Sequence, residues 1–273
     1  MPLSAHIPEI GIILYPGSQA AAVLGMTDLL TYAEEHARGK RESDRHLLRV
    51  SHWEWQDEAG ELVRVFDTVP GPEGNPSILA IPPGLGPPLP QEQAARYAQW
   101  LQGRHAQGTS LASICKGAFL LGETGLMAGR TVTTHWSYEE QLLSRFPEAK
   151  VDTDRLIIDD GDIITAGGVM AWIDLSLRLV DRFLGPTIMV ETARTFLVDP
   201  PGREQSYYSA FARRRGHPEG PTLASGDRGQ GDKPHRPGCP GRAGATDVDP
   251  ALPEGNGVDD QRVHPAPSGR KGA

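Results

Sequence analysis

The sequence predicts an α/β domain in which a mostly parallel sheet is covered by helices on both faces. Short apolar runs that end in Pro or Gly alternate with longer segments whose apolar residues recur at helical spacing, as at residues 7–15 followed by 19–37. Several of these runs lack a polar face, which is typical of strands buried on both sides of a parallel sheet. Such alternation favours βα units joined by right-handed connections.

The expected elements follow one another along the first 200 residues. Strands are expected at residues 7–15, 46–53, 62–66, 77–81 and 110–114, and a hairpin at 156–158 and 163–165 around the turn 159–162. Helices are expected at residues 19–37, 91–107, 117–123, 137–146, 169–183 and 187–197. We place the end of this domain, residues 1–200, near Pro200.

The composition changes after residue 211. Residues 212–273 are rich in Gly, Pro, Asp and Arg and contain almost no large apolar residues. Such a segment cannot bury enough surface to offset its chain entropy, so we expect a disordered, low-complexity tail. The basic run RRR at residues 213–215 is diluted by later aspartates, which favours a solvated tail over a nucleic-acid-binding one.

Charge and cysteine usage exclude several classes of function. The net charge of -8 provides no basic field for phosphates, so nucleic-acid binding by this chain alone is not expected. No apolar run approaches the roughly 18 residues of a membrane helix, and the start lacks a secretory pattern, so we expect a cytoplasmic protein without membrane contact. The 2 cysteines, Cys115 and Cys239, predict neither a disulfide framework nor a zinc site. No metal or cofactor is expected.

The segment SICKGA, residues 113–118, places Cys115 between an expected strand and an expected helix. Its spacing is that of a nucleophile elbow, in which close packing of strand against helix requires small neighbours such as Gly117. A helix N-terminus and the charge of Lys116 would both lower the pKa of the thiol, which predicts a reactive cysteine. The alternative is that Cys115 is a small buried hydrophobic residue, and the spacing alone leaves both interpretations open.

A glycine-containing loop follows the strand expected at residues 77–81. Open α/β sheets bind ligands at the carboxyl ends of their strands, so Gly84 and Leu85 are expected to face Cys115 across a crevice. Their backbone N–H groups, with that of Lys116, could form a nest for an anion or oxyanion. This interpretation predicts a small-molecule pocket, and the alternative is that residues 83–86 only form a turn.

Three longer segments carry a family resemblance. ILAIPPGLG (78–86), SLASICKGAFLLGETGLMAGRTVTTHW (110–136) and ITAGGVMAWIDLSLRLVDRFLG (164–185) resemble, in content and order, the DJ-1/PfpI domain of AraC-type (GlxA-like) regulators and of isocyanide hydratases. The resemblance spans about residues 10–211. It implies a flavodoxin-like three-layer sandwich, usually homodimeric, with Cys115 as the elbow cysteine and with a close backbone approach at Gly167 and Gly168 beside it.

The same resemblance identifies two departures from the enzymes of the family. In enzymatic relatives a carboxylate three residues before the position of Gly25 hydrogen-bonds the cysteine, and this chain has Ala22 there. The residue after the cysteine is commonly Thr or His in active relatives, and here it is Lys116. Without a positioned acid or base, general acid–base catalysis worth roughly 100-fold to 10,000-fold is missing. Enzymatic activity is therefore not the leading expectation.

Two further polar residues are expected to support the site. His135, in the motif THW, could act as a base for Cys115, but a hydrogen-bonded structural histidine is the favoured interpretation. Asp174 resembles a family position that we interpret as a buried polar support. Both are therefore expected near the pocket without a direct catalytic role.

The leading functional hypothesis is a ligand-sensing, homodimeric domain of an AraC-type transcription regulator, which binds a small molecule of unknown identity. Residues 201–211 resemble the linker to a DNA-binding half, and no helix-turn-helix pattern follows them. We interpret the later sequence as GC-rich coding read in a shifted frame. The alternatives are a cysteine-dependent enzyme of the isocyanide hydratase or glyoxalase-like type and a thiol redox sensor acting through Cys115.

Overall fold

The computed structural model describes residues 7–71, 75–199, 202 and 204–206. The chain divides into one unit at Met1–Thr222 and a second at Leu223–Ala273, and every described residue lies in the first. The predicted tail at 212–273 and Cys239 therefore lie outside the described residues. The same is true of most of the predicted linker at 201–211.

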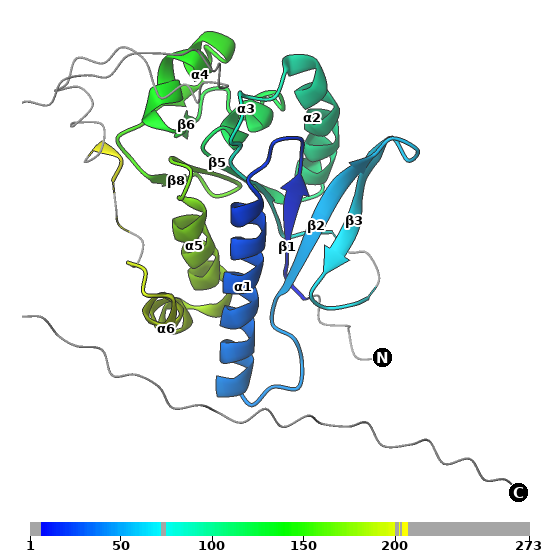
Figure 1. Ribbon diagram of the computed structural model, residues 1–273, viewed down its shortest axis with the longest axis vertical. Helices are drawn as coiled ribbons and strands as arrows, with labels where there is room; N and C mark the ends of the chain where they lie inside the picture. Colours follow the sequence, from blue (N-terminus) through cyan, green and yellow to red (C-terminus); the bar gives the residue numbers. More distant parts are fainter. Residues whose placement is uncertain (1–6, 72–74, 200–201, 203, 207–273) are drawn as a thin grey trace, which may run out of the picture. The chain divides into compact units, whose positions relative to one another are not determined.

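Seven strands of the described residues form the central sheet, in the order β3-β2-β1-β4-β5-β9-β8 (Figure 1). They are β1 (Glu9–Leu14), β2 (Arg49–Gln56), β3 (Glu61–Asp67), β4 (Ile78–Ile81), β5 (Ser110–Ile114), β8 (Ile157–Asp159) and β9 (Ile163–Ala166). The five inner strands β2, β1, β4, β5 and β9 are parallel. Counted in chain order they run 2-1-3-4-5, which is the flavodoxin-like order. The predicted fold class is confirmed.

Antiparallel strands form both edges of the sheet. β3 pairs with β2, and β8 pairs with β9 as the hairpin that the sequence predicts around residues 159–162. Gly161 provides the turn between β8 and β9, because its φ of +86° is left-handed backbone that favours glycine. Two short strands that the sequence did not predict, β6 (Thr131–Val132) and β7 (Lys150–Val151), pair outside the main sheet.

Helices cover both faces of the sheet. They are α1 (Ala20–Lys40), α2 (Gln91–Ala106), α3 (Gly117–Gly122), α4 (Glu139–Arg145), α5 (Trp172–Leu184) and α6 (Pro186–Phe196), with a 3-10 turn η1 (Trp136–Tyr138) before α4. One face carries α1, α5 and α6, and Figure 1 shows α1 and α5 side by side in front of the sheet. The other face carries α2, α3 and α4. The result is a three-layer sandwich.

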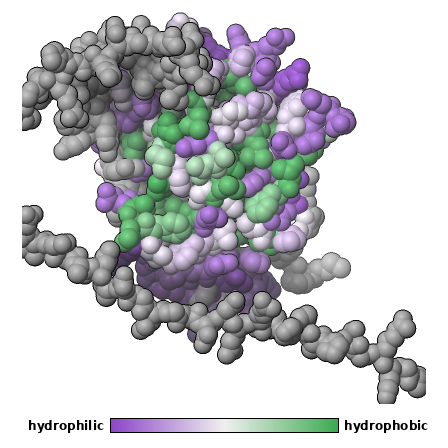
Figure 2. All heavy atoms as spheres, in the orientation of Figure 1, coloured by the Kyte–Doolittle hydropathy of each residue, from purple (hydrophilic) through white to green (hydrophobic). Residues whose placement is uncertain are grey.

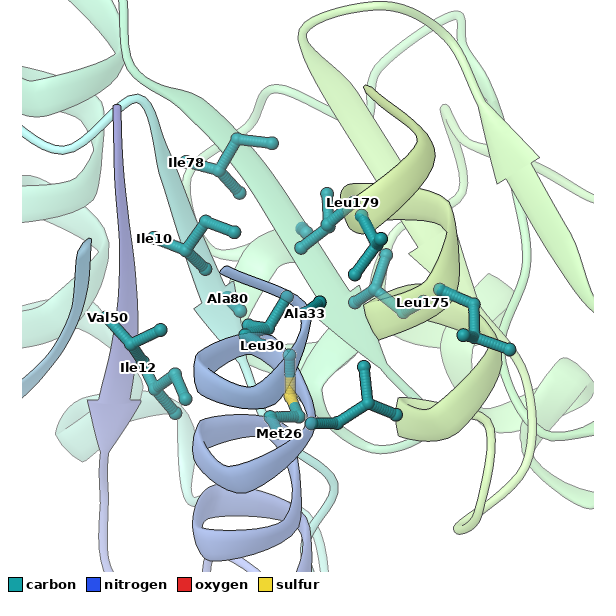
Figure 3. Close-up of a cluster of buried hydrophobic side chains, with 14 of the residues drawn as sticks. Ile10, Ile12, Met26, Leu30, Ala33, Val50, Ile78, Ala80, Leu175 and Leu179 are labelled. Carbon is teal, nitrogen blue, oxygen red and sulfur yellow. The ribbon is translucent and has the colours of Figure 1, made fainter. Parts of the chain in front are cut away.

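Two hydrophobic clusters fill the space between these layers. Along β1 the side chains alternate, so that Ile10 and Ile12 join the cluster under α1 and α5 while Ile13 joins the one under α2 and α3. Figure 3 shows Met26 and Leu30 of α1 lying among these sheet residues, with α5 side chains beyond them. Full burial of each such side chain contributes about 1.5–3 kcal/mol. The α1–α5 layer is therefore anchored to the sheet over its whole length.

The helix predicted at residues 169–183 begins later, at Trp172. The preceding residues form a loop in which Gly168 has a left-handed φ of +82°. The indole ring of Trp172 covers Gly25 of α1 so closely that a Cβ on Gly25 would lie 2.4 Å from the ring. The glycine thus permits α1 and α5 to approach each other, a contact that no local pattern reveals.

Two kinds of feature are absent from the described part of the chain. None of its helices is both long and apolar enough to cross a membrane. Within the same residues, His, Cys, Asp and Glu side chains form no group of three or more that could hold a metal ion.

Candidate functional site

Cys115 lies where β5 turns into α3, in the backbone conformation of an elbow. Its φ is +53°, a left-handed value that costs a non-glycine residue about 1–3 kcal/mol. Position 117 requires glycine, because a Cβ there would lie 2.6 Å from the carbonyl oxygen of Ile81 in β4. The small residue predicted after the cysteine is therefore required by the approach of α3 to the neighbouring strand.

The thiol of Cys115 is sealed from solvent. Its exposed fraction is 0 %, and it belongs to the cluster under α1 and α5. Burial raises the pKa of the thiol to about 11, although the backbone N–H groups of Lys116 and His135 and the charge of Lys116 act to lower it. The prediction of a lowered pKa is wrong, because loss of hydration outweighs those contributions. A thiol facing an open crevice is likewise not what the structure shows.

The glycine loop lies against the elbow and is occupied by internal contacts. The backbone N–H of Leu85 donates to the carbonyl of Gly17 at 3.2 Å, so it is not available to the predicted anion nest. The ammonium of Lys116 donates to the carbonyl oxygens of Leu85, at 3.3 Å, and of Gly86. The hydroxyl of Tyr15 donates to the carbonyl of Pro82 at 2.7 Å. Lys116 thus fastens the loop to the elbow and is not free to receive a substrate.

The side chain of Gln205, from the segment predicted to follow the domain, approaches Gly167 closely, whereas the sequence predicts a backbone approach beside Cys115. A Cβ on Gly167 would lie 1.8 Å from Nε2 of Gln205. Gln205 is 3 % exposed, and its Nε2 donates to Thr133 Oγ1 at 3.0 Å and to the carbonyls of Thr134 and Arg155 at 2.9 Å. Its Oε1 accepts from a backbone N–H, that of Trp136, at 3.3 Å.

Gln205 is linked to the elbow through a single residue. Thr134, whose carbonyl accepts from Gln205, also donates through its hydroxyl to the carbonyl of Cys115 at 2.8 Å. Gln205 is not among the site residues predicted from the sequence. Its signal was weak, since it appears only within the segment 201–211 that resembles a linker.

Gly167 and Gly168 line a hollow of about 380 Å³ together with His135 and Gln205. Cys115, Gly84 and Leu85 do not line this hollow, so the structure separates the predicted glycine pair from the predicted thiol pocket. Met170, which is 51 % exposed, forms part of its apolar rim. The hollow can accept a small apolar group but offers it no thiol.

His135 and Asp174 are the two polar residues that the sequence predicts as supports of the site. The Nδ1 of His135 accepts from the backbone N–H of Ser137 at 3.2 Å and lies 2.7 Å from its hydroxyl, so the imidazole caps the turn η1. Burial, and then the charge of Lys116, lower the pKa of His135, which keeps the ring neutral at pH 7. Asp174 is 1 % exposed in the first turn of α5.

A larger hollow of about 800 Å³ lies at the carboxyl ends of β1 and β2, and we call it the β1–β2 hollow. It is lined by Leu14, Tyr15, Pro16, Ser18, Ala20, Val23, Leu24, His52, Glu54, Trp55, Asp57, Gln93, Arg96 and Tyr97. Tyr15 connects it to the glycine loop, since its hydroxyl donates to the carbonyl of Pro82 at 2.7 Å. No local sequence pattern reveals this hollow, because its lining comes from α1, β2 and α2, which are far apart along the chain.

Comparison with known proteins identifies the family. The sequence pattern of the DJ-1/PfpI family matches residues 65–182, a region that contains the glycine loop, the elbow and the Gly167–Gly168 pair. An isonitrile hydratase from Pseudomonas putida is 33 % identical over 200 residues, which cover 68 % of this chain and 75 % of that enzyme. The chain belongs to the DJ-1/PfpI family. The resemblance inferred from the sequence is confirmed.

Regulators occur among the relatives of this DJ-1/PfpI protein as well. The HTH-type transcriptional regulator CdhR of Pseudomonas aeruginosa is 35 % identical over 100 residues, which cover 37 % of this chain and 30 % of the regulator. The chain therefore matches less than a third of that regulator's length. A crystal structure of an AraC family transcriptional regulator from Pseudomonas putida shares the fold, with a TM-score of 0.51 and 17 % identity, covering 69 % of this chain and 99 % of the other.

Proposed function

We propose that this DJ-1/PfpI chain is the ligand-sensing and dimerising half of an AraC-type transcription regulator. The observation that carries the proposal is the neutral, solvent-inaccessible thiol of Cys115, whose pKa burial raises to about 11. A thiol is a nucleophile only as the thiolate. Ala22, buried on α1, provides no carboxylate to remove its proton. The chain keeps the elbow but has neither a thiolate at neutral pH nor a carboxylate at position 22 to form one, which favours binding over catalysis.

The position of Gln205 supports a sensing role. In a regulator of this type, the segment after the sensor domain leads toward the DNA-binding half. Here that segment is attached by Gln205 to Thr133 and Thr134, and Thr134 in turn bonds the backbone of Cys115. A ligand that moves the elbow or the small hollow beside it would change this attachment. The arrangement thus provides a physical connection between ligand binding and the segment that leaves the domain.

Exposed apolar side chains support dimerisation. Met170 before α5 and Phe196 on α6 are 51 % and 38 % exposed. Figure 2 shows apolar patches on the face of the molecule that carries these helices. Apolar surface of this kind marks interaction sites when it is contiguous. We propose that a second copy of the chain covers it.

The sensing function predicts ligand binding that does not depend on the thiol. A metabolite screen by thermal shift should yield compounds that raise Tm equally in the wild type and in Cys115→Ala. At a ligand concentration of 100 times Kd the stabilisation is about 2.7 kcal/mol. The same sample should give a dimer by light scattering, twice the chain mass of 29.5 kDa, and no gel shift with promoter DNA. Ligand-induced shifts that vanish in Cys115→Ala would contradict this proposal.

The isonitrile hydratase relative favours a second candidate, hydration of isonitriles through Cys115. We expect the purified full chain to consume no isonitrile beyond the rate of the Cys115→Ala variant, because the thiolate is rare and Ala22 cannot assist proton transfer. Loss of the isonitrile absorption band in the infrared measures consumption directly. Turnover that Cys115→Ala abolishes would establish the hydratase and reject the sensor.

A further inference from the structure

We propose that the β1–β2 hollow binds an organic cation, an amine or alkylammonium group carried on a compact apolar body. This inference deepens the proposed sensing function by naming the class of ligand, and rests on it. The hollow lies at the carboxyl ends of β1 and β2, the edge at which open α/β sheets bind ligands, beside the reversal of strand order between β1 and β4. Its volume of about 800 Å³ suits a small metabolite.

One end of the β1–β2 hollow is apolar. Leu14, at the end of β1, meets Val23 and Leu24 from the first turns of α1. Pro16 and Ala20 complete this end of the lining. Leu24 is 59 % exposed, so a ligand placed here would remove apolar surface from water. This end fits hydrocarbon and provides no charge to it.

The other end is built from two aromatic rings on different elements. Trp55 of β2 and Tyr97 of α2 have ring centroids 5.7 Å apart, with an angle of 50° between the ring planes. Both rings line the β1–β2 hollow. A cation within about 6 Å of such ring faces is attracted by their quadrupoles, most strongly by tryptophan. Two inclined rings can contact one ammonium group from two directions.

Carboxylates surround the same end and outnumber the cations there. Asp57 accepts from Nε1 of Trp55 at 3.0 Å, and Nη1 of Arg96 lies 3.9 Å from the same oxygen. Glu54 has no cationic partner in the part of the chain that the structure describes. Burial raises the pKa of Tyr97, the charges of Glu54 and Asp57 raise it further, and that of Arg96 lowers it, so all three charges lie near this ring.

The charge balance of the lining therefore favours a cation. Two carboxylates, Glu54 and Asp57, stand against one guanidinium, that of Arg96, which leaves one negative charge in excess. His52 adds no positive charge at pH 7, because burial lowers its pKa and its Nε2 lies 2.8 Å from the hydroxyl of Thr27. An anionic ligand would meet Glu54 without compensation. A cation would pair with it.

A matched pair of probes tests the charge requirement. Choline carries a quaternary ammonium, and 3,3-dimethylbutan-1-ol has the same shape with carbon in place of nitrogen. Titration calorimetry on the full chain should give a Kd of roughly 1 mM or tighter for choline. The neutral alcohol should bind at least about tenfold more weakly, because it lacks the interaction with the rings and with Glu54.

Three variants test the location. Glu54→Gln and Trp55→Leu should each weaken choline binding by about tenfold, because one removes the charge and the other the ring. Glu61→Gln is the matched control, since Glu61 is exposed on β3 and does not line the hollow. Its affinity should equal that of the wild type. Thermal unfolding of each variant verifies that the fold is retained.

Equal affinities for choline and the neutral alcohol, or no binding of choline, would overturn the inference. Choline binding that Glu54→Gln and Trp55→Leu leave unchanged would overturn it as well, because the site would lie elsewhere. A failure of the proposed function can be told apart from a failure of this inference. If choline binds as expected but isonitriles are consumed through Cys115, the cation site stands and the sensing role falls. If only neutral or anionic compounds stabilise the protein, the sensing role stands and the cation site falls.

Discussion

Replacing Gly117 with alanine is expected to lower the free energy of unfolding by about 3 kcal/mol. The new Cβ would lie 2.6 Å from the carbonyl oxygen of Ile81 and 3.0 Å from that of Pro82. Both contacts are backbone atoms of β4 and the glycine loop, so no side chain can move aside to relieve them. For a domain of this size the loss corresponds to a fall in Tm of roughly 6–12 °C. Thermal and urea unfolding followed by circular dichroism measure it.

Gly103→Ala is the matched control for this experiment. Gly103 lies inside α2, and a Cβ added there would meet nothing within 4 Å. Alanine should therefore leave the domain as stable as before or make it up to about 1 kcal/mol more stable, because glycine is a poor helix former. If Gly117→Ala proves no more costly than Gly103→Ala, the described packing of α3 against β4 is wrong.

Replacing Gln205 with alanine is expected to cost about 2 kcal/mol. The change removes four hydrogen bonds and leaves the backbone N–H of Trp136 and the carbonyls of Thr134 and Arg155 without this partner. Hydrogen exchange should rise locally at residues 133–136. Gln141→Ala, on the exposed side of α4, is the matched control and should have almost no effect.

A double-mutant cycle between Gly167 and Gln205 tests whether the Gln205 side chain packs over Gly167 or whether its replacement only lowers stability in general. Gly167→Ala in the wild type should expel the Gln205 side chain, because the Cβ would lie 1.8 Å from its Nε2. In the Gln205→Ala background the same change should cost little, so the two effects should be strongly non-additive. Additive effects would show that the Gln205 side chain does not pack against Gly167.

Much of the fold could be predicted because it is encoded locally. The strand at residues 110–114 was predicted with the bounds that β5 has, and the hairpin of β8 and β9 follows from apolar runs on either side of the turn at residues 159–162. The elbow at Cys115 could also be predicted, because its spacing reflects a steric requirement at Gly117. These features depend on neighbours in sequence, and the family resemblance supplied their arrangement in space.

The environment of the site could not be predicted in the same way. The thiol pKa depends on how completely distant elements cover Cys115, and spacing within one segment does not report that. Lys116 was expected to activate the thiol, yet its ammonium is bound by carbonyls of the glycine loop some 30 residues earlier. Gln205 reaches Thr133 across 72 residues. Desolvation and long-range hydrogen bonds decide the chemistry here.

A redox sensor acting through Cys115 is disfavoured for the same reason as a hydratase. Oxidation of cysteine proceeds through the thiolate and requires access to the oxidant. Cys115 is fully buried and its pKa is raised. The neutrality of this one thiol is therefore what distinguishes the proposed sensing domain from both cysteine-dependent alternatives.

Alkylation of Cys115 as a function of pH measures that neutrality most directly. In the Cys239→Ser variant Cys115 is the sole cysteine of the chain, and intact mass reports its reaction with iodoacetamide. With a pKa of about 11, the rate at pH 8 should be more than about 100-fold below that of the same chain unfolded in urea, whose thiol titrates near 8.5. Because the thiol is sealed from solvent, the slow reaction that remains requires opening of the fold. A rate at pH 8 within about tenfold of that of the unfolded chain would reveal an accessible thiolate and contradict the account.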